Sequence, residues 1–474
     1  MSTPARCDEG LASRGGKRTS ARHPVATIAA TILGSSLAFI DGSVVNVALP
    51  TLGRAFHAGP AALAWTINAY LLPLGALILL GGALGDHYGR RRVFQLGTAV
   101  FLLASLLCTF APTLSLLLAG RGLQGIGSAL LMPNSLAILG ASFSGAARGR
   151  AIGTWAAAGA VAGAVGPLLG GWIVDVFGWR PIFLINLPIG VAAVWLSRYA
   201  DESHDRREAS RLDWAGGLVA TVGLGVIVWA LSAAAEPSAL RLALWAAGAA
   251  GTGLLAVFVW IEVRKGNAAL MPPGLFATSS FIGLSLLTFF LYAALGGLIV
   301  LLPFVLIRLG HYSAIEAGAA MLPIPLLIGL GSRAMGSVAA KMGGRLLLSG
   351  GSLVVAAGLA LYVRIDGGAI DYWRDILPST LLIAVGMAVC VAPLTTSVME
   401  SVDADHVGAA SGFNSALARI GGLLATALLG FVFAAAGDGA AFVTRIHYAA
   451  IAGAGCCVLA AVCAYGLMKP ARKK

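Results

Sequence analysis

Long apolar runs separated by short polar connections make up most of this chain. A helix needs about twenty residues to cross the hydrocarbon core of a bilayer, and on that measure the runs predict about fourteen membrane-spanning helices. The expected extents are 25–50, 62–84, 93–111, 114–141, 151–175, 180–198, 214–234, 240–262, 280–306, 316–340, 346–363, 376–399, 408–435 and 446–468. An even number of spans places both termini on the same side of the membrane.

The composition supports a membrane protein. Of 474 residues, 58% are hydrophobic and only 11% are charged, whereas a soluble globular domain has about a quarter charged residues. The formal net charge of +12 is spread over short loops between the spans. It therefore indicates topology and not a nucleic-acid partner. We expect an all-α polytopic protein of the cell (inner or plasma) membrane, in contact with the lipid bilayer.

The lysines and arginines predict the orientation of the spans. Those in the terminal segments and in alternate loops lie on one face, about three for each one on the other face, and the positive-inside rule makes this face cytoplasmic. The basic tails 1–24 and 469–474 are therefore expected in the cytoplasm. One loop on the same face is acidic, with Glu400, Asp403 and Asp405. These carboxylates are candidates to face the arginines at 90–92.

The pattern of cysteines and histidines does not favour a metal site, a disulfide framework or a cofactor. Five of the six cysteines lie in apolar runs and the histidines lie mostly in loops, without metal-ligand spacing. A membrane enzyme or receptor is the alternative class. No nucleophile with a nearby base supports catalysis, so no catalytic residue is assigned. The cysteines are Cys7, Cys108, Cys390, Cys456, Cys457 and Cys463.

Two short basic loops indicate an internal repeat. Gly82-Ala-Leu-Gly-Asp86-His-Tyr-Gly89-Arg90-Arg91-Arg92 and Gly336-Ser-Val-Ala-Ala-Lys341-Met-Gly343-Gly-Arg345 each follow a span that runs from outside to inside. Such repeats are typical of transporters built from two related halves. The expected organisation is an N-terminal six-helix lobe, an inserted helix pair, a cytoplasmic linker and a C-terminal six-helix lobe, at 25–199, 214–263, 264–279 and 280–468.

The first of these loops is predicted to be a cytoplasmic latch. Its arginines directly follow apolar sequence and must lie at a membrane face. Its glycines permit a tight turn, and Asp86 can approach a helix N-terminus. A loop that only sets topology is the alternative, and it does not explain the glycines and the aspartate together. The latch residues are Gly82, Asp86, Gly89, Arg90 and Arg91.

Asp41 is the only carboxylate well inside a predicted span. An ionisable side chain at such a depth costs about 2.5 kcal/mol or more on insertion scales. At about 1.5 Å per residue, Arg121 lies at a similar depth on the span 114–141. Desolvation and a nearby arginine act on the carboxylate in opposite directions, so conformation can decide whether it holds a proton. We predict that Asp41 and Arg121 form a proton-coupling pair. The alternative is a permanent structural ion pair.

Polar and aromatic residues within the spans are candidates to line a central substrate cavity. Each could equally form an interhelical hydrogen bond or face lipid. The C-terminal lobe has no deep carboxylate but has Arg333 and Arg419. If either arginine faces the cavity, neutral or anionic cargo is favoured over lipophilic dications, although both could bond to backbone or snorkel. The candidate cavity residues are Asn46, Asn68, Tyr70, Gln124, Asn134, Phe290, Tyr292 and Asn414.

A stripe of small residues with a proline runs along the span 151–175. Small residues at this spacing allow close approach of helices. A proline permits a bend, so we predict a hinge. A crowded but static helix interface explains the stripe equally well. The hinge residues are Gly159, Gly163, Gly166, Pro167 and Gly170.

Together these motifs resemble the fourteen-span drug:proton antiporter branch of the major facilitator superfamily. The loop at 82–92 is similar to the superfamily's loop motif, and Arg121 to Ala129 resembles its helix-4 motif. The stripe from Gly159 to Gly171 is similar to the helix-5 motif that marks exporters. The resemblance extends over nearly the whole chain through Asp41 to Pro50, Trp65 to Tyr70, Pro393 to Thr396 and Gly408 to Asn414.

The resemblance implies the major facilitator fold and a proton-driven exporter. It would extrude small, mostly apolar compounds or drugs by alternating access, as a monomer and without a cofactor. It also implies that Asp86 caps the inner end of the helix 408–435, and that Arg90 and Arg91 pair with carboxylates there. The alternative is a dedicated exporter of one metabolite. An importer is disfavoured only through the helix-5 motif, and an adaptor or outer-membrane channel as partner stays undecided.

Overall fold

The computed structural model describes residues 22–204, 213–235, 240–266, 271–366, 370–403, 407–435 and 439–468. In these ranges the chain is helical and has no strand. Thirteen helices are long and apolar enough to cross a membrane, and the segment Pro181–Ser197 is a further, shorter apolar helix. The prediction of an all-α protein with about fourteen apolar helical segments is thereby confirmed.

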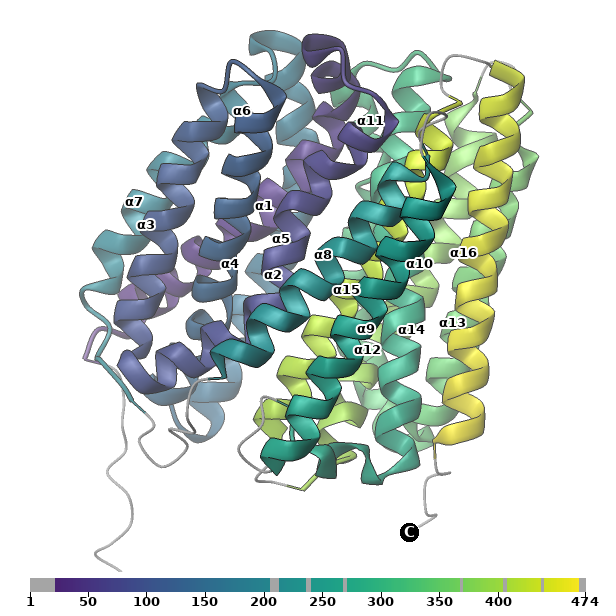
Figure 1. Ribbon diagram of the computed structural model, residues 1–474. Coiled ribbons are helices and arrows are strands. Elements are labelled where there is room, and N and C mark those ends of the chain that lie inside the picture. Colours follow the sequence, from purple (N-terminus) through teal and green to yellow (C-terminus); the bar gives the residue numbers. More distant parts are fainter. Residues whose placement is uncertain are drawn as a thin grey trace, which may run out of the picture.

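The N-terminal half of the structure is one bundle of helices, on the left in Figure 1. The fifth and sixth spans of the bundle meet at a tight turn, and the sixth is broken into two short helices. Its elements are α1 (Pro24–Phe56), α2 (Pro60–Tyr88), α3 (Arg90–Thr109), α4 (Leu114–Ser142), α5 (Gly145–Phe177), α6 (Pro181–Leu184) and α7 (Asn186–Ser197).

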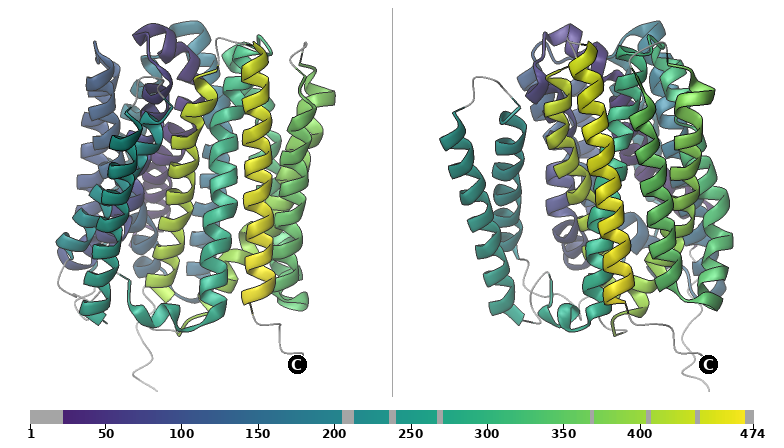
Figure 2. Two further views of the ribbon diagram at one scale, coloured as in Figure 1. Left: turned by 45° about the vertical axis from the view of Figure 1, so that its right-hand side comes forward. Right: turned by 90° about the vertical axis from the view of Figure 1, so that its right-hand side faces the viewer.

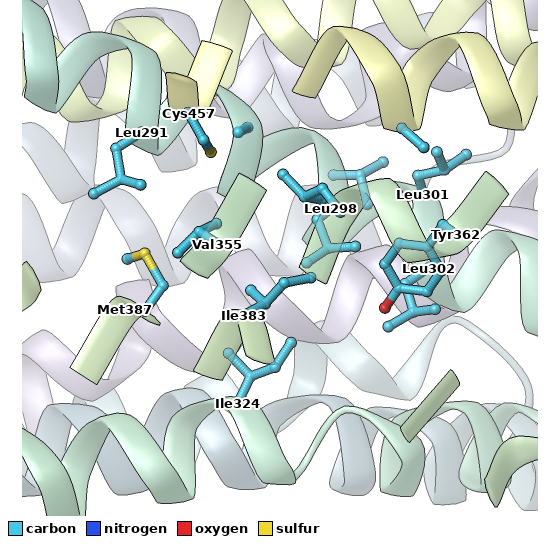
Figure 3. Packing of buried hydrophobic residues seen from close by; sticks show 14 of the residues in the cluster. Leu291, Leu298, Leu301, Leu302, Ile324, Val355, Tyr362, Ile383, Met387 and Cys457 are labelled. Carbon is cyan, nitrogen blue, oxygen red and sulfur yellow. The ribbon is translucent and has the colours of Figure 1, made fainter. Parts of the chain in front are cut away.

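The C-terminal half is a second bundle, on the right in Figure 1. The largest cluster of buried apolar side chains lies mainly in this half, and Figure 3 shows Leu298, Val355 and Ile383 meeting in it. The elements are η3 (Pro273–Ala277), α10 (Ser279–Arg308), α11 (Ala314–Ala320), α12 (Pro323–Met342), α13 (Gly344–Ala360), η4 (Leu361–Arg364), η5 (Tyr372–Ile376), α14 (Leu377–Glu400), α15 (Val407–Phe433) and α16 (Gly439–Leu467).

Two helices between the halves form a hairpin, α8 (Trp214–Ala233) and α9 (Arg241–Lys265). The right-hand view of Figure 2 shows them together at one side of the molecule. α8 packs against both α2 and α15, whereas α9 buries few residues. Asp213 caps α8 by accepting from the Gly216 amide (2.6 Å) and pairs with Lys265 Nζ (2.5 Å). Glu262 accepts from the amide of Met271 (2.6 Å) and so attaches the hairpin to the segment that leads to α10.

The helices differ from the expected spans mainly at their ends. α1 continues through Pro50 to Phe56, α5 begins at Gly145 and α16 begins at Gly439. The hydropathy pattern marks only the apolar part of a helix, whose polar ends extend beyond it. The expected span 316–340 is broken between α11 and α12, directly before Pro323. A proline lacks the N–H that would continue the ladder, so a break at this position is expected.

Candidate functional site

The carboxylate of Asp41 lies at the centre of a buried polar network near the midpoint of α1. The side chain is 1% exposed. Its Oδ2 accepts a hydrogen bond from Nη1 of Arg121 on α4. Its Oδ1 accepts from Nε2 of Gln124 and from Nδ2 of Asn186 on α7, both at 3.0 Å. The carboxylate therefore accepts from three side-chain donors, one of them a guanidinium, and charge-assisted hydrogen bonds of this kind are the strong ones.

A second layer of contacts fixes the donors themselves. Arg121 is also 1% exposed, and its Nη1 donates to Oε1 of Gln124 at 2.7 Å. Its Cζ lies 4.5 Å from the centre of the Tyr70 ring, a cation–π distance. Ser105 Oγ accepts from both Gln124 and Asn186, at 2.9 and 3.2 Å. The structure therefore brings Asp41, Arg121, Gln124 and Tyr70 together, as one network of α1, α2, α3, α4 and α7.

Asn186 and Ser105 are parts of this network that were not among the candidate residues. Asn186 is fully buried and lies 145 residues from Asp41 in the chain. Its only sequence signal is an amide in an otherwise apolar run, because polar side chains in a bilayer need partners. That signal does not identify the partner. The contact depends on how α7 is rotated against α1 and α3.

Three other predicted cavity residues instead hold helices together. Asn134 donates to the carbonyl oxygens of Gly81 (2.9 Å) and Leu130 (2.7 Å), which joins α4 to α2. Asn414 Oδ1 accepts from Thr288 Oγ1 at 2.5 Å and joins α15 to α10. The amide of Asn68 lies 3.3 Å from both the Leu423 oxygen and the Ala427 nitrogen across the two halves. These contacts match the alternative of interhelical hydrogen bonds.

The remaining candidates lie at different places. Asn46 is buried in α1. Phe290 lines an apolar crevice of about 780 Å³ formed mainly by α10, α15 and α16. Tyr292 on α10 lies within electrostatic range of Arg419. The side chain of Arg333 lies outside the described part of the structure.

The loop at 82–92 forms a tight junction between α2 and α3. Gly89 has φ +108°, which L side chains rarely adopt, and Asp86 pairs with Arg90 across it at 2.7 Å. Gly82 packs near Pro133. The partner of the Arg91 amide is Glu202 Oε1 at 2.9 Å, and the Arg91 guanidinium donates to the Ala200 oxygen.

The expected partners of this loop therefore need correction. Asp86 and Arg90 pair with each other, and Arg91 and Arg92 face Glu202 instead of carboxylates beside α15. Of the three acidic residues of the loop before α15, Asp405 lies outside the described residues. A motif specifies charges, whereas the partner they reach depends on how the two halves are tilted in a given state.

The small-residue stripe of α5 packs against both halves. Gly159, Gly166 and Gly170 contact Phe39, Ser43 and Val44 of α1, whereas Gly163 has no neighbour within 4 Å. Towards the other end, a Cβ on Gly171 would lie 2.3 Å from the carbonyl oxygen of Ala314 on α11. A Cβ on Gly318 would likewise lie 2.2 Å from the Pro167 oxygen. Only glycine permits the α5 and α11 backbones to approach so closely.

This contact lies at the top of Figure 1, at the end opposite to the C-terminus. The charge pattern predicts that this end is the outer one. Along the inner part of α5, Gly149 and Gly153 have no neighbour within 4 Å. On the inner part of α14, Thr395 and Thr396 are exposed. α5 is thus packed tightly against the C-terminal half at the predicted outer end, whereas these positions towards its inner end are open.

Asp175 adds a charged contact between α5 and α11 at the predicted outer end. Its Oδ1 and Oδ2 accept from the backbone amides of Ala314 (3.1 Å) and Ile315 (2.8 Å). Ser313 and Glu316 complete the first turn of α11 as a capping box within the C-terminal half. A carboxylate at a helix N-terminus is stabilised by the unpaired amides and the helix dipole. Asp175 therefore joins α5 to α11 across the two halves, and it was not among the candidate residues.

Most of this chain matches the sequences of known transport and resistance proteins. The profile of the Major Facilitator Superfamily matches residues 31–426. The multidrug resistance protein Stp of Mycobacterium tuberculosis (strain CDC 1551 / Oshkosh) is 34% identical over 420 residues, covering 87% of this chain and 76% of Stp. The methylenomycin A resistance protein of Bacillus subtilis (strain 168) is 32% identical over 403 residues, covering 84% of this chain and 85% of that protein.

Solved structures of the same fold include transporters of distant sequence. A bacterial homolog of the human lysosomal transporter Spinster, in an inward-facing and unoccupied conformation, has a TM-score of 0.64 and 17% identity. The match covers 94% of this chain and 97% of that one. A D-xylose–proton symporter has a TM-score of 0.65 and 15% identity, covering 94% and 98%. These matches show a shared fold.

Proposed function

The chain belongs to the major facilitator superfamily and is a multi-pass membrane transporter, and we propose that it exports small, mostly apolar drug-like compounds in exchange for protons. The observation that best supports the exchange is the Asp41 network, a carboxyl group buried near the midpoint of a spanning helix and paired with Arg121. Relatives named for resistance to drugs and antibiotics support the cargo class.

Protonation of Asp41 is the proposed coupling step. A proton arriving from the outer side neutralises the carboxylate, and Arg121 then loses its charged partner. Protonation also turns one carboxyl oxygen into a donor in a network whose other members donate to it, so the hydrogen bonds from Gln124 and Asn186 must rearrange as well. One proton moving down a potential of 100 mV supplies about 2.3 kcal/mol, enough for about a fiftyfold concentration ratio of cargo.

Alternating access is proposed to proceed by movement of the lobe 25–199 against the lobe 280–468. The tight α5–α11 contact and the open inner part of α5 support an inward-facing state with the outer end closed. The stripe from Gly159 to Gly170 would act as the hinge. Both termini would lie in the cytoplasm of a cell-membrane protein. The protein would act as a monomer that needs no cofactor.

The test uses the purified protein in proteoliposomes with an imposed pH gradient and an uncharged, apolar fluorescent compound such as Nile red. Gradient-driven movement of the drug against its concentration, abolished by an uncoupler, is expected. The control is liposomes without protein. Drug movement that follows only its own concentration gradient would refute proton coupling.

The junction of α2 and α3 leads to a first prediction. Asp86→Asn removes the charge that holds Arg90 at 2.7 Å and frees the arginine beside Gly89. We expect the turnover number to fall several times more than the apparent affinity, because the loop lies far from Asp41 and acts on conformational change. Initial rates over a range of drug concentrations separate the two quantities. A change in affinity alone would contradict a role in the latch.

The contact of Asp175 with α11 leads to a second prediction. Asp175→Asn removes the charge and one of the two acceptors at the α11 N-terminus. The exposed position limits the cost to about 0.5–1 kcal/mol, which shifts the population towards outward-open states about two- to fivefold. Spin labels at Val176 and Arg308 would report this as a larger fraction of long distances.

Glu316→Gln is the matched control for this prediction. It weakens the same helix turn but acts only within the C-terminal half. We expect it to leave the Val176–Arg308 distance distribution as in the parent. If both variants widen the distribution equally, the contact across the halves is not what closes the outer end.

A further inference from the structure

Arg419 places a positive charge in the middle of the molecule. It lies near the midpoint of α15 (Val407–Phe433) and contacts two helices of the other half. A Cβ on Gly75 of α2 would lie 3.4 Å from Arg419 Cβ, and Arg419 Nη2 lies 3.2 Å from Met132 Sδ on α4. The side chain therefore stands at the contact between the N-terminal and C-terminal halves.

The structure describes no charged partner for Arg419. All five ion pairs among the described residues join other groups. The buried Nε of Arg419 has no hydrogen-bond partner there. Its nearest polar neighbours are the thioether of Met132, a weak acceptor, and the hydroxyls of Tyr70 and Tyr292 within electrostatic range.

The other arginine in the middle of the molecule, Arg121, does have a charged partner. Arg121 is paired with Asp41, so the two charges of that network cancel. The Tyr70 ring, which Arg121 covers at 4.5 Å, is also within electrostatic range of Arg419. One positive charge therefore stays uncompensated at the centre of the described helices. An ionised side chain at this depth is unfavourable without a partner, and such residues mark functional paths.

We propose that Arg419 binds an anionic oxygen group of the exported compound, such as a carboxylate or phenolate. This proposal rests on the exporter function proposed above and narrows its cargo to small, mostly apolar acids. A guanidinium offers a planar pair of donors that matches a carboxylate. The thioether of Met132 adapts readily to apolar groups of different shape. The acidic group would thus lie between the two halves. A change in their tilt would then alter which side of the membrane the group can reach.

Binding of charge-matched probes to the purified full-length protein in detergent tests the proposal. The first pair is fluorescein, an anion, and rhodamine 123, a cation on the same xanthene skeleton. The second pair is 1-naphthoate and 1-naphthylmethylammonium. The parent protein is expected to prefer the anion in both pairs. Arg419→Gln should lose about tenfold or more of the anion affinity and leave the cation affinity within about twofold.

Two variants separate binding from structure. Arg419→Lys keeps the charge and should retain most of the anion preference. Arg308→Gln, which removes an exposed arginine of α10, should bind both probes as the parent does. The melting temperature of Arg419→Gln should be equal to or above that of the parent, because an uncompensated charge is removed. A lower melting temperature with unchanged anion preference would assign Arg419 a structural role and overturn the proposal.

The proposal and the exporter function fail in different measurements. A parent protein that prefers the cation, or an anion preference that survives in Arg419→Gln, overturns the role of Arg419. Absence of proton-driven movement in proteoliposomes refutes the exporter function, whereas the anion preference is measured without any gradient.

Discussion

Asp41→Asn is expected to abolish proton-driven export while cargo exchange continues. The asparagine has a similar shape, but its NH₂ group faces either Arg121 or the amide donors of Gln124 and Asn186, and it cannot carry a proton across. For an uncharged cargo, the steady-state concentration ratio should fall from about fiftyfold at 100 mV to unity. Counterflow of labelled cargo against unlabelled cargo, which needs no net proton movement, should persist.

Asp366→Asn is a suitable control, because it removes an exposed carboxylate outside the helices and away from the loop at 82–92. It should behave as the parent in both assays. If Asp41→Asn still builds a gradient of cargo, the buried carboxylate is a structural ion-pair partner and another group carries the proton. Loss of counterflow together with gradient-driven export would instead indicate that the variant no longer cycles at all.

Arg121→Gln is expected to cause the largest loss of stability. It leaves Asp41, 1% exposed, without a charged partner. Breaking a buried ion pair from one side costs about 3–5 kcal/mol. The double variant Asp41→Asn with Arg121→Gln leaves no unpaired charge, so it should regain most of the stability and stay inactive in gradient-driven export.

Thermal unfolding of the purified variants in detergent measures this cycle. A double variant as unstable as Arg121→Gln alone would show that Arg121 stabilises the bundle through Tyr70 and Thr66 and not through Asp41. Recovery of stability without recovery of export would separate the packing role of the pair from its proton-coupling role.

The meeting of Asp41 and Arg121 could be predicted because both helices have the same rise per residue and cross the same apolar layer. Depth along the chain then limits which ionisable groups can meet. The same argument could not find Asn186 or Asp175, whose partners lie 145 and about 140 residues away. Depth does not specify the rotation of a helix about its axis.

The asparagine side chains within the spans show a second limit of prediction from sequence. Asn68, Asn134 and Asn414 are polar groups in apolar runs, and such a group can face a cavity or bond to a neighbouring helix with the same sequence pattern. The structure shows hydrogen bonds to neighbouring helices for Asn134 and Asn414, and the Asn68 amide lies at hydrogen-bond distance from the α15 backbone. For the loop at 82–92, the pattern indicated charges and a tight turn, whereas the pairing with Glu202 depends on the tilt of the halves.

By itself the sequence determined that this is a polytopic helical membrane protein with a buried acid and a buried arginine at matching depth. The reason is that a bilayer requires about twenty apolar residues per helix and makes every charge within it costly. Only the tertiary structure decided which groups meet: Asn186 contacts Asp41, Asp175 contacts α11, and Arg419 has no anionic partner in the part of the chain that the structure describes. Such contacts depend on helix rotation and on the tilt of one half against the other, which local sequence does not specify.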